Sequence, residues 1–314
     1  MTPDPDPRLD PRAQARAFQR AASHYASAAA LTREVGRRQL ERFDLMRLSP
    51  AVVLDLGAGP GIHTEALAVR FPQARVLALD RALPMLVQFG SAAAPSGVIA
   101  RLWHRLGARS GTPPNTPGVL RVCADWLALP FAPASVDLVW SNFALQHAAD
   151  LPLLLSELHR LLRVGGLLMA SLPGPDSGLE LRHAFHQAGL APRLHHLPDM
   201  HDVGDALVAA RFADPVVDME RITLEYPTAA ALWRDARALG AIDARAVRPR
   251  GLTTPRMFAR IERALAEANG PGPLRLTVEV VYAHAWKAAP RTTEEGHAIV
   301  RAEQIGGRKR RGAA

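Results

Sequence analysis

The sequence predicts an α/β fold in which helices cover both faces of a mostly parallel sheet. The apolar stretch 52–56 has the composition of a strand buried on both faces, and it runs into a glycine-rich turn at 57–61. Strand-like and helix-like segments then alternate as far as residue 172. Acidic residues stand at or near the ends of three strand-like segments, at Asp55, Asp80 and Asp125.

Composition limits the class of protein. The chain has 314 residues, 48% hydrophobic and 22% charged, which is typical of a globular protein. A single cysteine, no apolar run of membrane length and no signal-peptide core at the N-terminus favour the cytoplasm. The net charge of +8 comes mostly from arginine. It indicates either a solvated arginine surface or an acidic partner, such as nucleic acid or an acidic carrier protein.

The N-terminal region divides into a tail and two helices. Residues 1–11 are rich in proline and aspartate and are expected to be disordered. Residues 12–48 show helical periodicity, with Phe18, Ala21 and Tyr25 on one face. These two helices either form a lid over a cofactor or pack on the sheet.

The glycine turn predicts a nucleoside cofactor, since glycines let the backbone approach a ligand closely. A second strand, 74–80, ends in Asp80, where a carboxylate accepts from ribose hydroxyls. A dinucleotide loop would need a third glycine where Ile62 stands. Acids beside the loop suit S-adenosylmethionine (SAM), which has no phosphate, better than NAD. A plain connector between strand and helix is the alternative for this loop taken alone.

The core continues with further elements. A helix follows at 62–71 and another at 84–88, where Met85 is placed to cover an adenine. Residues 90–119 form a basic inserted segment. The third strand, 120–126, ends with Asp125, placed to accept from the adenine amine, and Trp126, placed to pack on the ring.

The remaining elements are expected as follows. A fourth strand covers 135–142, and the helix 151–163 ends in a left-handed cap at Gly165-Gly166 before a fifth strand at 167–172. Later segments predict helices at 179–188, 199–210 (with Asp202 as cap), 229–240 and 254–269, one or two strands at 216–226, and a strand at 274–286. This divides the chain into a SAM-binding core, 49–175, a C-terminal α+β extension and substrate cap, 176–289, and a basic disordered tail, 290–314.

The core motifs resemble those of class I SAM-dependent methyltransferases. They are VVLDLGAGPG, VLALD, CADWLALPF, SVDLVWSNFALQ and ELHRLLRVGG, in order. The resemblance implies a Rossmann-like fold with SAM as cofactor.

A narrower resemblance spans roughly residues 17 to 288. AFQRAASHYASAA, RALPMLVQ, SNFALQH, LGAIDARAVRPRGLTTPRMFARIE and LRLTVEVVYAHAWK are similar to the malonyl-acyl-carrier-protein O-methyltransferase family of biotin synthesis. This implies methylation of the free carboxylate of a malonyl thioester on an acidic acyl carrier protein. The chain has Gln146-His147 where that family often has Gln-Trp.

Two alternatives remain open for the acceptor. One is a small molecule or quinone precursor. The other follows from features shared with complex I assembly factors of methyltransferase fold, LELR at 179–182 and AWK at 285–287. Some of those proteins hydroxylate arginine, so a protein partner is the second alternative.

The expected site follows from the motifs and the resemblance. The cofactor-binding residues are Asp55, Gly57, Ala58, Gly59, Gly61, Asp80, Arg81, Met85, Asp125, Trp126 and Asn142. Tyr25, Asn142 and Gln146 position the reactants, and the substrate contacts Tyr25, His147, Arg245 and Arg248. No general base is expected, because a malonyl carboxylate is ionised near neutral pH. The histidine spacings fit no metal site. We expect a monomer that binds neither nucleic acid nor membrane.

Overall fold

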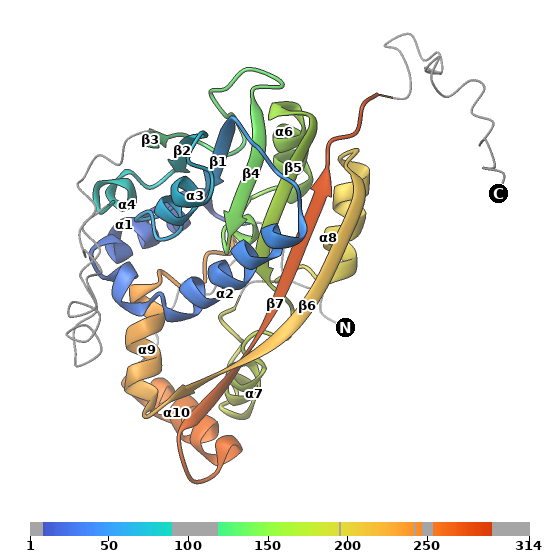
Figure 1. The fold of residues 1–314 in the computed structure, drawn as a ribbon. Coiled ribbons are helices and arrows are strands. Elements are labelled where there is room, and N and C mark those ends of the chain that lie inside the picture. The colour runs from blue at the N-terminus through green and yellow to red at the C-terminus, as the bar shows by residue number, and fades with distance from the viewer. Residues whose placement is uncertain (1–8, 90–118, 195, 242, 247–253, 291–314) are drawn as a thin grey trace, which may run out of the picture.

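The computed structural model describes residues 9–89, 119–194, 196–241, 243–246 and 254–290, which form an α/β fold around one sheet (Figure 1). The seven described strands lie in the order β3-β2-β1-β4-β5-β7-β6. Their bounds are β1 Val52–Leu56, β2 Arg75–Asp80, β3 Val119–Cys123, β4 Val136–Asn142, β5 Leu162–Pro173, β6 Ala213–Tyr226 and β7 Leu274–Trp286. The first five strands in this order, β3, β2, β1, β4 and β5, run parallel to one another. Strand β7 is antiparallel to both β5 and β6.

The order of the strands places the site. From β1 the chain moves outward through β2 to β3, then returns to pair β4 with the other side of β1. The connection that follows β1 and the connection that follows β4 therefore lead to opposite sides of the sheet's centre. In an open α/β sheet, ligands bind in the crevice at the carboxyl ends of the strands at such a switch point.

Helices cover both faces of the sheet. On one face, α3 (Thr64–Arg70) and the turn η1 (Arg42–Leu45) pack Leu67, Phe71 and Phe43 around Trp140 of β4. On the other face, α6 (Leu151–Leu161) and α8 (Met200–Ala209) pack leucine and valine side chains onto the strands in the larger apolar cluster. Apolar residues thus face both ways along β1, as its four apolar residues in five positions predict.

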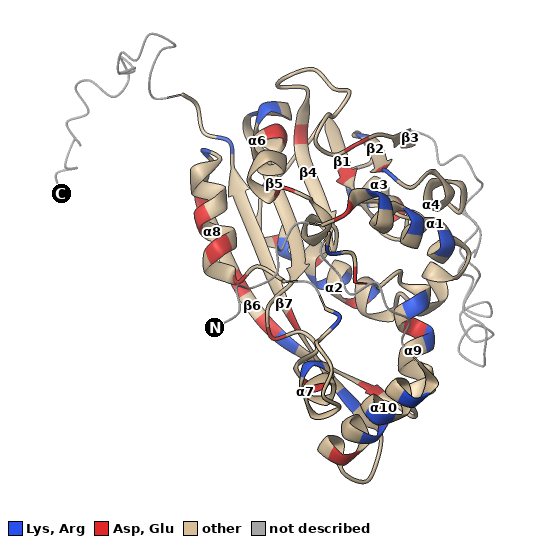
Figure 2. Cartoon of the chain, turned by 180° about the vertical axis from the view of Figure 1, so that it is seen from behind, with Lys and Arg blue, Asp and Glu red and all other residues tan. Residues whose placement is uncertain are grey.

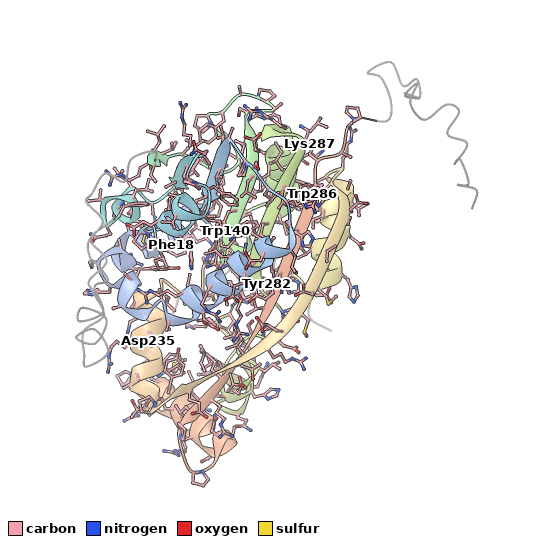
Figure 3. All side chains as sticks on the ribbon, viewed as in Figure 1. Phe18, Trp140, Asp235, Tyr282, Trp286 and Lys287 are labelled. Carbon is pink, nitrogen blue, oxygen red and sulfur yellow. The ribbon has the colours of Figure 1, made fainter. Side chains whose placement is uncertain are left out.

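Of the two N-terminal helices, the second packs on the first face of the sheet, and the first packs against the short helix that follows β2. The N-terminal helices are α1 (Pro11–Ala28) and α2 (Ala30–Glu41), followed in the chain by α4 (Leu83–Val87) after β2. Helix α2 buries Val35 against Val278 and Val280 of β7. Arg42, at the end of α2, lies 4.1 Å from the ring centroid of Tyr282, which is labelled in Figure 3. The lid region is therefore attached to the C-terminal extension as well as to the core.

The C-terminal extension surrounds the protruding ends of β6 and β7. Its helices are α7 (Leu179–Gln187), α9 (Ala229–Ala238) and α10 (Pro255–Asn269), which pack their own apolar cluster around Leu274. Helix α9 also reaches α1, where Gly240 abuts the ring of Phe18. No described helix is both long enough and apolar enough to cross a membrane.

Four boundary predictions need correction. The helix α6 ends at Leu161, and β5 begins at Leu162, so Gly165-Gly166 is not a helix cap. Gly165 does have a positive φ of 80°, but it lies inside β5, where its N–H donates to Lys287 O at 2.7 Å. The long β7 extends the sheet at this point and holds the glycines in the strand.

The other corrections are smaller. Leu9 and Asp10 are ordered, because Leu9 bridges Arg245 and Asp10 caps α1. Asp199 is the cap of α8, and Asp202 completes the capping box from the third helical position. Strand β3 begins at Val119 and ends at Cys123, so Asp125 and Trp126 lie in the following turn. The predicted segments 90–118 and 291–314, and residues 1–8, lie outside the described residues.

Candidate functional site

The glycine turn after β1 is held against β2. Gly57, Gly59 and Gly61 have φ values of 76°, 56° and 82°, in the left-handed region that favours glycine. The N–H groups of Gly57 and Ala58 both donate to Leu79 O, at 2.8 and 3.0 Å. A Cβ on Gly57 would stand 2.3 Å from Ala144 Cβ, whereas one on Gly59 would meet nothing within 4 Å among the described residues. The middle of the turn is thus open to a ligand, and Gly57 is needed for close packing.

Two buried carboxylates flank this turn. Asp80, 9% exposed, accepts from Gly59 N at 3.0 Å and from Ala82 N at 2.7 Å, one bond to each oxygen. Each oxygen keeps a second lone pair for a ligand hydroxyl. Asp55, 3% exposed, accepts from Thr64 Oγ1 at 2.5 Å. Burial raises the pKa of Asp80, and it raises the pKa of Asp55 to about 7. Neither acid makes an ion pair with a described residue, although the charge of Arg81 acts on Asp80. The pair therefore favours a ligand with positive charge and hydroxyl groups.

A narrow pocket opens beside the acids. Predicted residues Tyr25, Asp55, Gly57, Ala58, Gly59 and Asn142 line it, together with Thr32, Ile62 and His63. Tyr25 and Thr32 come from the lid, which therefore closes over the carboxyl ends of β1 and β4. Burial raises the pKa of the Tyr25 hydroxyl, so this group stays protonated at neutral pH.

Two further residues that line the pocket, Thr32 and His63, were not predicted from the sequence. Asn142 Nδ2 donates to Thr32 O at 2.8 Å and lies 3.3 Å from His63 Nδ1, while Asn142 Oδ1 accepts from Ser171 Oγ at 2.8 Å. Asn142 thereby attaches the start of α2 to the sheet. Burial lowers the pKa of His63 to about 4, so its ring is neutral. Its contact with Gly36, where an added Cβ would lie 2.1 Å from Nε2, was not visible as a sequence pattern.

A polar chain connects the lid with both sides of the site. Buried Gln14 of α1 accepts from the Arg81 guanidinium, and its Nε2 lies 2.9 Å from His147 Nδ1. His147 lies in turn η2 (Leu145–His147), next to Gln146. The ring of Phe18 meets the His147 ring edge-on, with the centroids 4.9 Å apart; Figure 3 labels Phe18. Gln14 was not predicted, because a lone glutamine on an alanine-rich helix gives no signal by itself.

The other predicted cofactor residues surround the same region. Arg81 lies over the ring of Trp126, 5.2 Å from its centroid, and Trp126 in turn lies beside Gly57. Met85 packs against Ala21 and Ala22 of α1. Asp125 is exposed, and its Oδ1 accepts from Leu127 N at 3.0 Å.

The predicted substrate residues are less concentrated. Gln146 Nε2 donates to Phe143 O at 2.8 Å, and its Oε1 is buried with no hydrogen-bond partner among the described residues. Arg245 makes a bidentate ion pair with Asp243, at 2.8 Å for both bonds, and donates to Pro192 O. It is not among the described residues that line the pocket. Arg248 lies outside the described residues.

The residues present fit SAM. Asp80 offers acceptors for ribose hydroxyls, Gly59 leaves room at the turn, and Asp55 is a buried acid that makes no ion pair with the described part of the chain. No group of three or more His, Cys, Asp or Glu side chains in the described part of the chain could hold a metal ion.

Comparisons with known proteins agree with this geometry. Residues 54–170 match the family model described as "Methyltransferase domain". The chain is 42% identical over 282 residues to the malonyl-[acyl-carrier protein] O-methyltransferase of Gallionella capsiferriformans, covering 89% of this chain and 92% of that protein. It is 44% identical over 270 residues to the protein of the same name from Laribacter hongkongensis, covering 86% and 87%.

Among solved structures, the YcgJ protein from Bacillus subtilis superposes with a TM-score of 0.52 at 15% identity, over 81% of this chain and 100% of that one. This likeness shows the fold alone, a Rossmann-like methyltransferase fold.

Proposed function

The chain belongs to the malonyl-[acyl-carrier protein] O-methyltransferase family, and we propose that it methylates the free carboxylate of a malonyl thioester on acyl carrier protein. The observation that carries this proposal is the extent of the similarity. It covers 86–89% of the chain, whereas the methyltransferase domain alone covers residues 54–170. The similarity therefore extends beyond the methyltransferase domain into the lid, which contributes Tyr25 and Thr32 to the pocket, or into the C-terminal extension. We place the reaction in the synthesis of the biotin precursor, in the cytoplasm.

The protein is a methyltransferase, and its cofactor is SAM. When bound, SAM supplies an electrophilic methyl group on its sulfonium. We propose that Asp80 accepts from the ribose hydroxyls and that Asp55 faces the ammonium group. Trp126, Arg81 and Met85 enclose the adenine side, and the turn at Gly59 lies against the methionyl part.

The acceptor needs orientation and removal of water more than acid–base chemistry. Its carboxylate is already ionised near neutral pH, so the chain has no proton to remove. The Tyr25 hydroxyl remains protonated and can donate a hydrogen bond to that carboxylate. Asn142 acts by attaching α2 to the sheet over the pocket. Gln146 Oε1 can only accept a hydrogen bond. It therefore suits an N–H group on the arm that carries the malonyl thioester, and not the malonyl carboxylate. We do not assign substrate binding to Arg245, because Asp243 already compensates its charge.

A radiolabelled-methyl assay tests this proposal. Purified protein is incubated with SAM carrying a tritiated methyl group and with malonyl-carrier protein, acetyl-carrier protein or malonyl-pantetheine. We expect label on the malonyl substrates, released as methanol by mild base, and none on acetyl-carrier protein, which has no free carboxylate. SAM binding without label on any malonyl thioester would refute the proposed acceptor.

A further inference from the structure

The outer side of the lid helix α1 carries three arginines. Arg12, Arg16 and Arg20 follow at intervals of four residues, so they lie along one side of the helix. All three side chains are exposed. The other side holds the helix against the protein through its buried residues Ala13, Gln14, Ala17, Ala21 and Ala22.

These arginines make no ion pair with any described residue. Helix α1 contains no aspartate or glutamate, and Asp10 before it accepts from the backbone N–H groups of the first turn. On α2, by contrast, Arg37, Arg38 and Arg42 all pair with acidic side chains. Like charges at a spacing of four residues destabilise a helix. The arginines of α1 therefore oppose helix stability unless a negatively charged partner lies against them.

Arg12, Arg16 and Arg20 form a stripe on α1, and this stripe lies next to the pocket. The inner side of the same helix supplies Gln14, which bonds Arg81 and His147, and Tyr25, which lines the pocket. About 10 Å, the width of one helix, separates these arginines from Gln14, and Tyr25 lies about 8 Å beyond Arg20 along the helix axis. Figure 2 shows Lys and Arg on α1 and on the neighbouring α9, on the same side of the molecule. A partner on this surface would sit beside the entrance and not over the back of the sheet.

We propose that Arg12, Arg16 and Arg20 form the docking surface for the acidic body of the acyl carrier protein. This inference rests on the proposed function and adds the place where the partner binds. The thioester is attached to the carrier by a flexible arm, so the carrier body must stay outside while the arm enters the pocket. Opposite charges on the two surfaces orient the carrier and raise the association rate, and salt weakens this attraction.

Charge reversal with a matched control tests the surface. In the test variant Arg12, Arg16 and Arg20 are all replaced by glutamate. In the control Arg256, Arg260 and Arg263 are replaced by glutamate; these arginines are also exposed and make no ion pair with described residues, but they lie on α10, which packs on α7. Both variants carry the same change in net charge. Thermal unfolding and SAM titration verify that each variant folds.

The expected readout separates docking from catalysis. We expect the α1 variant to raise KM for malonyl-carrier protein about tenfold, with kcat/KM for malonyl-pantetheine unchanged. The KM of the wild type should rise with salt and that of the variant should not. The α10 variant should resemble the wild type. Equal behaviour of the two variants, or an equal loss on malonyl-pantetheine, would overturn the docking surface.

Direct binding keeps the two proposals distinguishable. Calorimetric titration of the wild type and both variants with malonyl-carrier protein measures docking without turnover. Weaker carrier binding by the α1 variant, with normal binding by the α10 variant, supports the docking surface even if the wild type transfers no methyl group. Absence of carrier binding by the wild type overturns it, even if malonyl-pantetheine is methylated.

Discussion

Gln14 Nε2 lies 2.9 Å from His147 Nδ1, although 133 positions separate the two residues in the chain. The direction of this bond can be worked out. Arg81 can only donate, so it fixes Gln14 Oε1 as an acceptor and leaves Nε2 to donate to His147. His147 Nδ1 therefore accepts this bond, while His147 Nε2 lies 3.2 Å from Gln146 Nε2. His147 thus has a specific partner in the lid.

Replacement of Gln14 by leucine should loosen the lid. Two partly buried polar groups, on Arg81 and His147, lose a partner, which costs about 1–3 kcal/mol. We expect a lower unfolding free energy, faster amide hydrogen exchange in α1 and a kcat/KM reduced by roughly tenfold. Gln19→Leu is the control, since Gln19 is exposed on the same helix. Equal effects of both replacements would show that the Gln14 bonds are unimportant.

Gly36→Ala should destabilise the protein, although alanine normally favours a helix by about 0.5–1 kcal/mol over glycine. The new Cβ would stand 2.1 Å from His63 Nε2 and would displace the ring from the pocket wall. Gly204→Ala on α8 is the matched control. There a Cβ makes only an ordinary contact, 3.8 Å from Val217 Cγ2, so it should be stabilising. Urea unfolding of both variants checks the opposite signs; stabilisation by Gly36→Ala would contradict the packing.

Asp80→Asn should weaken SAM binding by roughly 100-fold, because hydrogen bonds to a charged acceptor contribute about 1.5–3 kcal/mol each. Asp137→Asn is the control, because Asp137 lies near the amino end of β4, whereas Asp80 lies at the carboxyl end of β2. Asp137 also accepts from two backbone N–H groups, those of Ala51 and Val52 at 2.9 and 2.8 Å. We expect calorimetry to show normal SAM affinity for Asp137→Asn in folded protein. Normal affinity in Asp80→Asn would disprove the proposed ribose contact.

SAM affinity should rise with pH through about 7, the value to which burial raises the pKa of Asp55. Below that pH the carboxyl group binds a proton, which must leave before the acid can face an ammonium group. Binding at pH 6 to 7 should therefore release a proton, measurable by calorimetry in buffers of different ionisation enthalpy. Asp55→Asn should remove both the proton release and the pH dependence. Proton uptake by the wild type would contradict this assignment.

Much of the architecture could be predicted because it depends on local patterns. Mostly apolar segments identified β1 and β4, alternation identified β7, and helical periodicity identified α6. The cap at Gly165 was wrong for a non-local reason. Its backbone pairs with Lys287, which no pattern near residue 165 reveals.

The sequence by itself determined the fold class, the glycine turn, the acids at 55 and 80 and the family. Each of these depends on residues close together in the chain, whose periodicity or spacing is set by the geometry of one strand or one turn. Tertiary structure alone decided which lid residues meet the site. Gln14 against His147, Thr32 against Asn142 and Gly36 against His63 are contacts between segments that lie far apart in the chain. Their partners are selected by packing of α1 and α2 on the sheet, and packing has no period along the sequence.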